Sequence, residues 1–134
     1  GAYGLVGREL VQWLTQIQYC RDKNIWVVGG LDRKEDDYGR ALWVPQIEGA
    51  KAGNELPGIF DEIISMVALK DDSGNPYRAF VTHQVNPWGY PAKDRSGRLD
   101  MVEEPHLGRL MQKISGPKPE RIFQTQIKEG NNNE

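Results

Sequence analysis

Three cations follow one another closely after a run of turn-forming residues. Lys93, Arg95 and Arg98 are separated by two and three positions. The preceding stretch carries Pro87 and Pro91, which interrupt helix and weaken strand. A lysine and an arginine two positions apart can bind an oxyanion from two sides. The pattern therefore predicts a loop that presents positive charge, for which a phosphate or a nucleic acid is the natural anion.

The same loop holds two aromatic side chains, Trp88 and Tyr90. Exposed aromatic rings beside cations are typical of surfaces that face a ligand. We therefore expect Trp88 to contact nucleic acid. The alternative is an ordinary solvated loop whose cations only maintain solubility.

Other catalytic chemistry has little support from the spacing of residues. Cys20 is the only cysteine, which excludes a cysteine-based zinc cluster within one chain. His83 and His106 are 23 positions apart, with no helix to bring them together, so we expect no metal site. One alternative is a small metal-dependent nuclease; its candidate residues are Asp61, Glu62, Lys70 and His83.

The glycine-rich loops that wrap nucleotide phosphates are absent from this sequence. Neither Gly-x-x-x-x-Gly-Lys-Ser/Thr nor Gly-x-Gly-x-x-Gly occurs. We therefore expect no cofactor-binding residues in cis.

Composition indicates one domain in a reducing compartment. The chain has 134 residues, is 38% hydrophobic and carries a net charge of -2, so any polyanion would have to be bound by a local patch. No apolar run approaches the roughly twenty residues that span a bilayer. With a single cysteine, the sequence predicts a cytoplasmic protein without a membrane segment.

The sequence predicts both helices and strands that position the cationic loop. Apolar spacing predicts a helix over 5–24, with Cys20 on its buried stripe, and a strand covered on both faces over 25–31. No strand precedes this helix, so we expect the sequence to begin in the middle of a domain. The remaining expected elements are a charged hairpin over 32–47, a loop or short helical connection over 48–58, a short helix over 59–65, an antiparallel hairpin over 64–85 and a helix over 105–114.

With these elements in place, the chain resembles the C-terminal half of a RecA-like P-loop ATPase core. More closely, it is similar to phage-type nucleotide-binding proteins of DNA recombination and single-strand annealing. The resemblance covers residues 3–116 and depends on Tyr-Gly-Leu-Val-Gly-Arg-Glu-Leu at 3–10, Gln-Ile-Glu-Gly at 46–49, Leu-Pro-Gly-Ile-Phe-Asp-Glu at 56–62 and the stretch 86–100. Its most specific part is the Lys-x-Arg-x-Gly element that begins at Lys93.

The resemblance implies that Lys93 and Arg95 are trans-acting fingers, cations that reach the nucleotide of a neighbouring subunit. It implies ATP and Mg²⁺ in the intact protein, a ring or filament of identical subunits, and single-stranded DNA as a partner. Arg33, Lys34 and Arg40 of the charged hairpin would then contact DNA. In-chain ion pairs of Lys93 and Arg95 with Asp94 or Asp100 are the alternative.

The expected fold is α/β, a mixed sheet with flanking helices. It corresponds to a partial RecA-like core over 1–116 that lacks the phosphate-loop half, followed by a polar, disordered tail over 117–134. We expect no ATP hydrolysis by the chain alone. A non-enzymatic oligomerisation or nucleic-acid-binding module is the alternative to an ATPase fragment.

Overall fold

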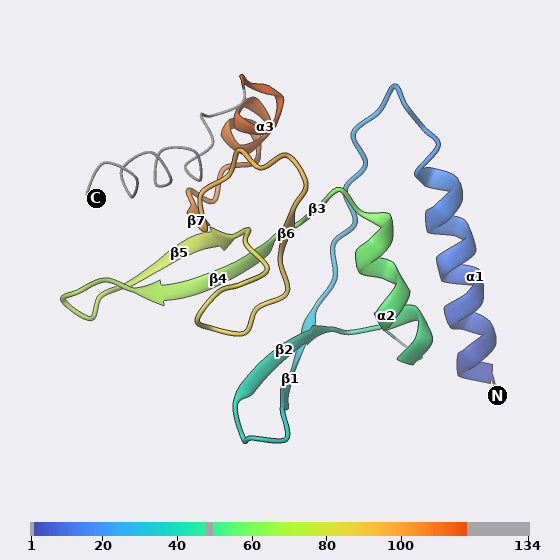
Figure 1. The fold of residues 1–134 in the computed structure, drawn as a ribbon, viewed down its shortest axis with the longest axis horizontal. Coiled ribbons are helices and arrows are strands. Elements are labelled where there is room, and N and C mark those ends of the chain that lie inside the picture. Colours follow the sequence, from blue (N-terminus) through green and yellow to red (C-terminus); the bar gives the residue numbers. More distant parts are fainter. Residues whose placement is uncertain (1, 48–49, 118–134) are drawn as a thin grey trace, which may run out of the picture.

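The computed structural model describes residues 2–47 and 50–117, which form three helices and seven short strands (Figure 1). The elements are α1 (Ala2–Ile17), β1 (Leu31–Glu35), β2 (Ala41–Pro45), α2 (Ala50–Ile59), β3 (Glu62–Ile63), β4 (Ser65–Lys70), β5 (Pro76–Val81), β6 (Lys93–Asp94), β7 (Val102–Glu103) and α3 (Leu107–Ser115). No helix within these described ranges is long and apolar enough to cross a membrane. The tail expected over 117–134 lies outside them, apart from residue 117.

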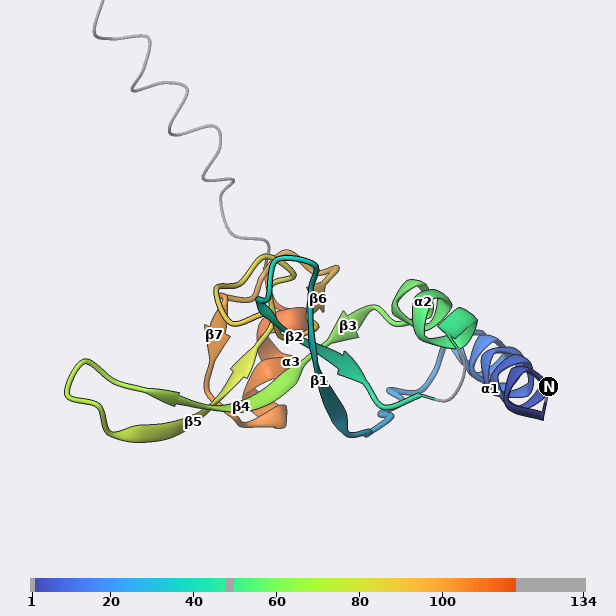
Figure 2. The ribbon, with the colours of Figure 1, turned by 90° about the horizontal axis from the view of Figure 1, so that it is seen from below.

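The strands form three small antiparallel sheets, β1–β2, β3–β6 and β4-β5-β7. Helices and strands are combined as expected, but the single mixed sheet that the sequence predicted is wrong for the described residues. The three-stranded sheet and α3 lie at one end of the molecule, and α1 and α2 lie side by side at the other (Figures 1 and 2).

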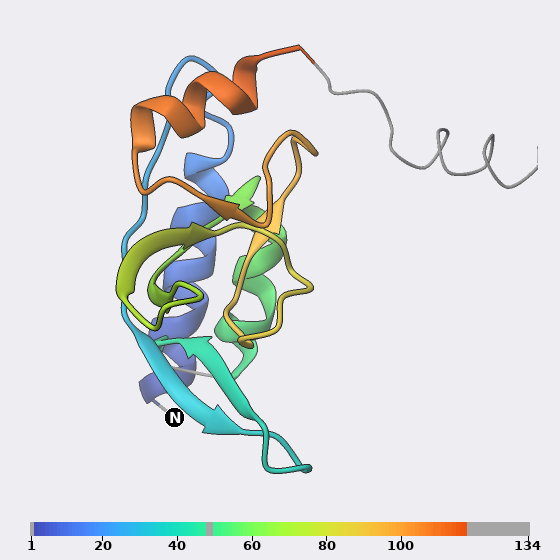
Figure 3. The same ribbon diagram turned by 90° about the vertical axis from the view of Figure 1, so that its left-hand side faces the viewer.

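Two apolar clusters cover the two faces of the β4-β5-β7 sheet. Val67, Ala79 and Val81 point to one face, where Trp88 and Tyr90 of the cationic loop pack against them. The other face is covered by α3 (Figure 3). The cluster on that side consists of Phe80, Leu99 and Leu110, with Ile64 and Ile114 packed against it. Because both faces are covered there, the last three residues of β5 are all buried rather than alternately exposed, whereas its first three residues are exposed. The hairpin predicted over 64–85 is confirmed, although β5 ends at Val81.

Helix α1 is confirmed but shorter than its apolar pattern indicated. It ends at Ile17, and Cys20, expected on its buried stripe, lies beyond the helix and is exposed. Only α2 packs closely against α1, so Leu14 is buried, whereas Val6 and Trp13 are 54% and 57% exposed. A single partner helix covers only one narrow stripe of a helix.

The strand predicted over 25–31 is wrong for all but Leu31, which begins β1. Residues 25–30 form no strand, and Val28 is 94% exposed. Within the described ranges no strand is paired with this segment, and Gly30 O accepts the N–H of Gln46 just after β2. A strand exists only when a neighbour pairs with its backbone, whatever the β-propensity of its side chains.

The short helix predicted over 59–65 is also wrong. Residues 62 and 63 form β3, because Ile63 pairs with Lys93 of β6 across a long stretch of chain. The region over 48–58 is helical in α2 from Ala50 onward; residues 48 and 49 lie outside the described part. Helix α3 is confirmed.

Four turns share the pattern Asx-x-x-Gly, and the local sequence explains all of them. The first side chain accepts the backbone N–H two residues later, and the fourth residue is a glycine with positive φ. The turns begin at Asp36, Asp71, Asn86 and Asp94 and place the glycines at φ 76°, 82°, 73° and 66°. Two of them close the β1–β2 and β4–β5 hairpins, and the other two shape the cationic loop.

Candidate functional site

Lys93 lies in β6, beside β3 and the C-terminal end of α2. Its Nζ atom donates to Pro57 O at 2.9 Å and to Phe60 O at 2.7 Å. The last carbonyl groups of a helix have no partner within the helix and carry partial negative charge. The Lys93 ammonium group therefore caps α2 and fastens β6 to it.

Arg95 follows β6 and is more accessible than Lys93. Its guanidinium NH1 donates to Asp61 Oδ1 at 2.6 Å, and its backbone N–H donates to Asp61 O at 3.2 Å. The two side chains are 58% and 73% exposed. An ion pair this exposed contributes little free energy, because water screens both charges.

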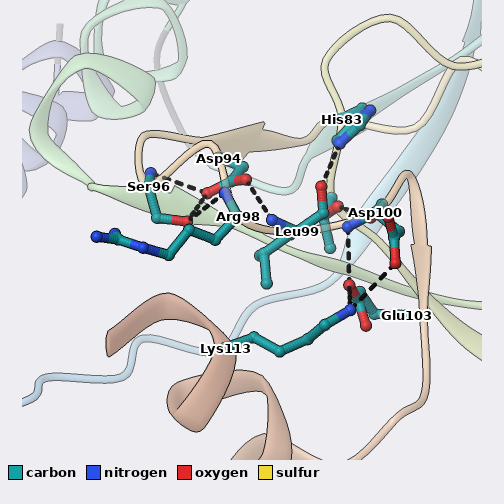
Figure 4. Close-up of polar contacts among 9 residues, drawn as sticks. His83, Asp94, Ser96, Arg98, Leu99, Asp100, Glu103 and Lys113 are labelled. Carbon is teal, nitrogen blue, oxygen red and sulfur yellow. Dashed lines mark hydrogen bonds and ion pairs between the residues drawn. The ribbon is translucent and has the colours of Figure 1, made fainter. Parts of the chain in front are cut away.

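Lys93 and Arg95 have other partners than the carboxylates that the sequence suggested. Neither Asp94 nor Asp100 pairs with the two cations: Arg95 binds Asp61, and Lys93 binds carbonyl oxygens. Asp100 instead accepts from Lys113 of α3 (Figure 4). The hydrogen bonds that Lys113 donates to the side chains of Glu103 and Asp100 raise the pKa of Lys113.

Asp94 organises the turn that joins β6 to Leu99 (Figure 4). Its Oδ1 accepts Ser96 N–H at 2.9 Å and the Ser96 hydroxyl at 2.6 Å, while Oδ2 accepts Leu99 N–H at 3.0 Å. Burial opposes ionisation of Asp94, but these donors and a hydrogen bond from Glu62 outweigh it and lower the pKa. Arg98, the third cation, donates from NH1 to Ile114 O at the end of α3.

The expected DNA-contacting residues lie on the β1–β2 hairpin and in the loop beside it. Arg33 and Lys34 are exposed on β1. Arg40 is also exposed, but it pairs with Asp36 at 2.7 Å and lies over the Tyr38 ring at 5.4 Å.

Trp88 is half-buried against the cluster around Val81 rather than facing solvent as expected. Its neighbour Tyr90 stacks on Trp43 of β2, with ring centroids 5.5 Å apart. The N–H of Trp43 donates to Gly89 O at 2.9 Å. These contacts fasten the β1–β2 hairpin to the part of the cationic loop at Gly89 and Tyr90, whereas Lys93 and Arg95 contact the end of α2 and Asp61 instead.

The nuclease residues are not brought together. Lys70 lies at the far end of β4 from Glu62, and the five residue steps of that strand alone span about 16 Å at roughly 3.3 Å each. The Nε2 atom of His83 is hydrogen-bonded to Leu99 O at 2.7 Å. Within residues 2–47 and 50–117, no three side chains of metal-binding type form a group.

Sequence reasoning missed the carboxyl pair of Glu62 and Asp94, which are direct neighbours across the β3–β6 sheet. It also missed Asp61 as the partner of Arg95. Both contacts join segments more than 30 positions apart. No spacing pattern within either segment signals them.

Lys93→Met is expected to lower the free energy of unfolding by about 1–2 kcal/mol. The substitution keeps most of the aliphatic side chain but removes both hydrogen bonds to the end of α2. Urea unfolding followed by circular dichroism measures the change. Lys34→Met on the exposed face of β1 is the control and should stay within about 0.5 kcal/mol of the wild type. Equal stability of the two variants would contradict the capping role.

Comparison with known proteins identifies the class of this chain. A family model of the AAA domain matches residues 1–96, which include both Lys93 and Arg95. No curated protein and no solved structure matches the chain. The match supports a nucleotide-binding function related to that of P-loop ATPases. Because it spans well over half of the sequence, the chain belongs to the AAA domain family.

Proposed function

We propose that this chain supplies the trans-acting fingers of an ATPase of phage-type DNA recombination or single-strand annealing. In the intact protein, ATP and Mg²⁺ bind one subunit of a ring or filament, and Arg95 of the neighbouring subunit reaches the phosphates. The observation that carries this proposal is the exposed position of Arg95, whose side chain is 58% exposed and, among the described residues, is paired with Asp61.

Arg95 can exchange its partner at little energetic cost. The exposed Asp61 offers one negative charge, whereas a bound triphosphate offers several, together with oxygen pairs that match the guanidinium fork. When charge develops on the transferred phosphoryl group, a cation at this place stabilises it. Arg95 is therefore the member of the pair that makes the contact.

Lys93 has a different task within the same pair. Its ammonium group is held by the carbonyl oxygens of Pro57 and Phe60, so it keeps β6 against the end of α2. Since Arg95 follows β6 directly, Lys93 fixes the place from which Arg95 extends. A second role of Lys93 at the phosphates would require it to leave these carbonyls.

The exposed apolar segment over 25–30 supports the view that further strands complete this domain. Val27 and Val28 are 49% and 94% exposed, and Trp26 is 46% exposed. Burial of such side chains on both faces of a parallel sheet stabilises an α/β core. We assign these strands to the phosphate-loop half of the ATPase, which would supply the ATP and Mg²⁺ site.

The β1–β2 hairpin is the proposed contact for single-stranded DNA. Arg33 and Lys34 are exposed there, and Arg40 lies near its tip. Contacts of this kind bind phosphates, are independent of sequence and weaken with salt. Trp88 contributes by supporting the loop behind the hairpin. The single cysteine suits a protein that acts in the reducing cytoplasm.

The experiment measures the assembly of the intact protein by sedimentation velocity, with and without ATP and Mg²⁺. ATP should increase assembly of the wild type, and Arg95→Ala should lose most of that increase, because the neighbour's phosphates lose their cation. Arg109→Ala is the matched control: this arginine is 64% exposed and pairs with Glu104 in the same chain, but lies on α3. An unchanged response of Arg95→Ala would favour a non-enzymatic oligomerisation or nucleic-acid-binding module instead.

A further inference from the structure

Two carboxyl groups meet across the β3–β6 sheet. Glu62 and Asp94 are paired directly in its register. The backbone N–H of Ser96 lies 2.9 Å from Asp94 Oδ1 and 3.3 Å from Glu62 Oε1, so one donor serves both groups. Two carboxylates that share a donor at these distances repel each other when both are ionised.

The hydrogen bonds show which of the two groups carries the charge. Asp94 accepts three donors from Ser96 and Leu99, an arrangement that favours the ionised form. Glu62 Oε1 accepts only the longer, 3.3 Å bond from Ser96 N–H. Its other oxygen, Oε2, is buried without a hydrogen-bond partner among the described residues. An unpartnered buried oxygen favours the neutral acid, which can donate its proton to Asp94.

The surrounding charges do not neutralise Glu62. Asp61 adds negative charge beside it, and Arg95 is already paired with Asp61. Lys93 faces the carbonyl oxygens of α2, and Arg98 donates to Ile114 O of α3. The nearest cation of α3, that of Lys113, is bound to Glu103 and Asp100.

We propose that Glu62 and Asp94 form a proton-operated latch, which holds β3 against β6 while one proton is shared and loosens when it leaves. The proton passes to solvent, and two adjacent carboxylates then face each other across the sheet. Loosening weakens the bond from Arg95 N–H to Asp61 O, which spans the same pair of segments. If the proposed function holds, the latch regulates release of Arg95 toward the nucleotide.

The pH at which the latch opens follows from the protonation of Glu62. Burial, together with the hydrogen bond to Asp94 and its charge, raises the pKa of Glu62 from 4.5 to about 7. Between these two values the folded chain binds more protons at Glu62 than the unfolded chain does. This contribution to stability is therefore present in full below pH 4.5 and is lost as the pH rises toward 7.

Amide hydrogen exchange on the full 134-residue chain tests the latch without nucleotide, so its outcome is independent of the proposed function. The Arg95 amide should lose about tenfold in protection factor between pH 6 and pH 8, after correction for intrinsic exchange, which is the change that one proton with a pKa near 7 allows. Glu62→Gln, which stays neutral and can still donate to Asp94, should abolish that loss. Glu104→Gln, an exposed glutamate beside α3, should leave it unchanged.

Constant protection in the wild type, or an equal loss in Glu62→Gln, would overturn the latch. A carbon-13 titration of the wild-type Glu62 carboxyl group provides a second measurement that requires no variant. We expect a midpoint near pH 7, and a midpoint below about pH 5 would also overturn the latch.

Discussion

Arg95→Ala in the intact ATPase is expected to lower the rate of ATP hydrolysis by about a thousandfold, the effect of losing a trans-acting arginine. ATP affinity should fall far less than turnover, because in the proposed assembly the phosphate loop of the other subunit supplies most of the ground-state contacts and Arg95 only the one that favours assembly. Steady-state turnover and equilibrium nucleotide binding measure the two effects separately. Arg95 suits this role because its side chain is largely exposed and its ion pair with Asp61 is weakened by the surrounding water.

Arg109→Ala again provides the control for the loss of an exposed, ion-paired arginine, and its turnover should match that of the wild type. Arg95→Lys keeps the charge but loses the planar fork, so we expect it to recover only part of the rate. Full turnover in Arg95→Ala would contradict the trans-acting role. Complete loss of ATP binding together with turnover would contradict it as well, because Arg95 would then supply the main contact to bound ATP instead of the phosphate loop.

Gly89→Ala is expected to lower the free energy of unfolding by about 3 kcal/mol or more. Gly89 has φ +73°, which strains any residue with a Cβ atom, and an added Cβ would lie 2.6 Å from the backbone oxygen of Ala41. Relief requires the β1–β2 hairpin to move away from the cationic loop. Such a movement would lengthen the bond from Trp43 N–H to Gly89 O and separate Trp43 from Tyr90.

Gly74→Ala isolates the backbone strain from the steric contact. Gly74 has φ +82° in the β4–β5 turn, but an added Cβ would meet nothing within 4 Å. This variant should therefore lose only about 1–2 kcal/mol, the cost of the left-handed conformation. Urea unfolding gives both values, and tryptophan fluorescence reports the Trp43 contact. Equal losses in the two variants would show that the hairpin does not rest on the loop at Gly89.

The elements that could be predicted from the sequence are those whose causes are local. The turns at Asp36 and Asp71 are determined within five residues by an Asx side chain and a glycine, so both hairpins were expected correctly. Helix α3 has a strong apolar periodicity and a buried Leu110, and it was expected correctly too. The resemblance to P-loop ATPases agrees, at the level of that broad class, with the AAA domain match.

The features that the sequence could not predict depend on distant partners. Residues 25–30 have the composition of a buried strand, yet the described chain provides no neighbouring strand for them. Lys93 and Asp94 were recognised as polar loop residues, but their partners are Phe60 and Glu62, more than 30 positions earlier. Trp88 was expected to face a ligand because cations follow it in the sequence. No local pattern shows that it packs against the cluster that contains Val81 and Val67.

The exposed segment over 25–30 also determines how the chain behaves when it is handled alone. Val28 and its apolar neighbours present unpaired backbone and uncovered side chains, the combination that drives edge-to-edge aggregation of β-prone sequences. Precipitation should therefore become more severe with concentration, and added salt should aggravate it by weakening charge repulsion between molecules. Co-expression with the strands that we propose to cover this segment would remove the cause itself, whereas a change of buffer would only slow the process.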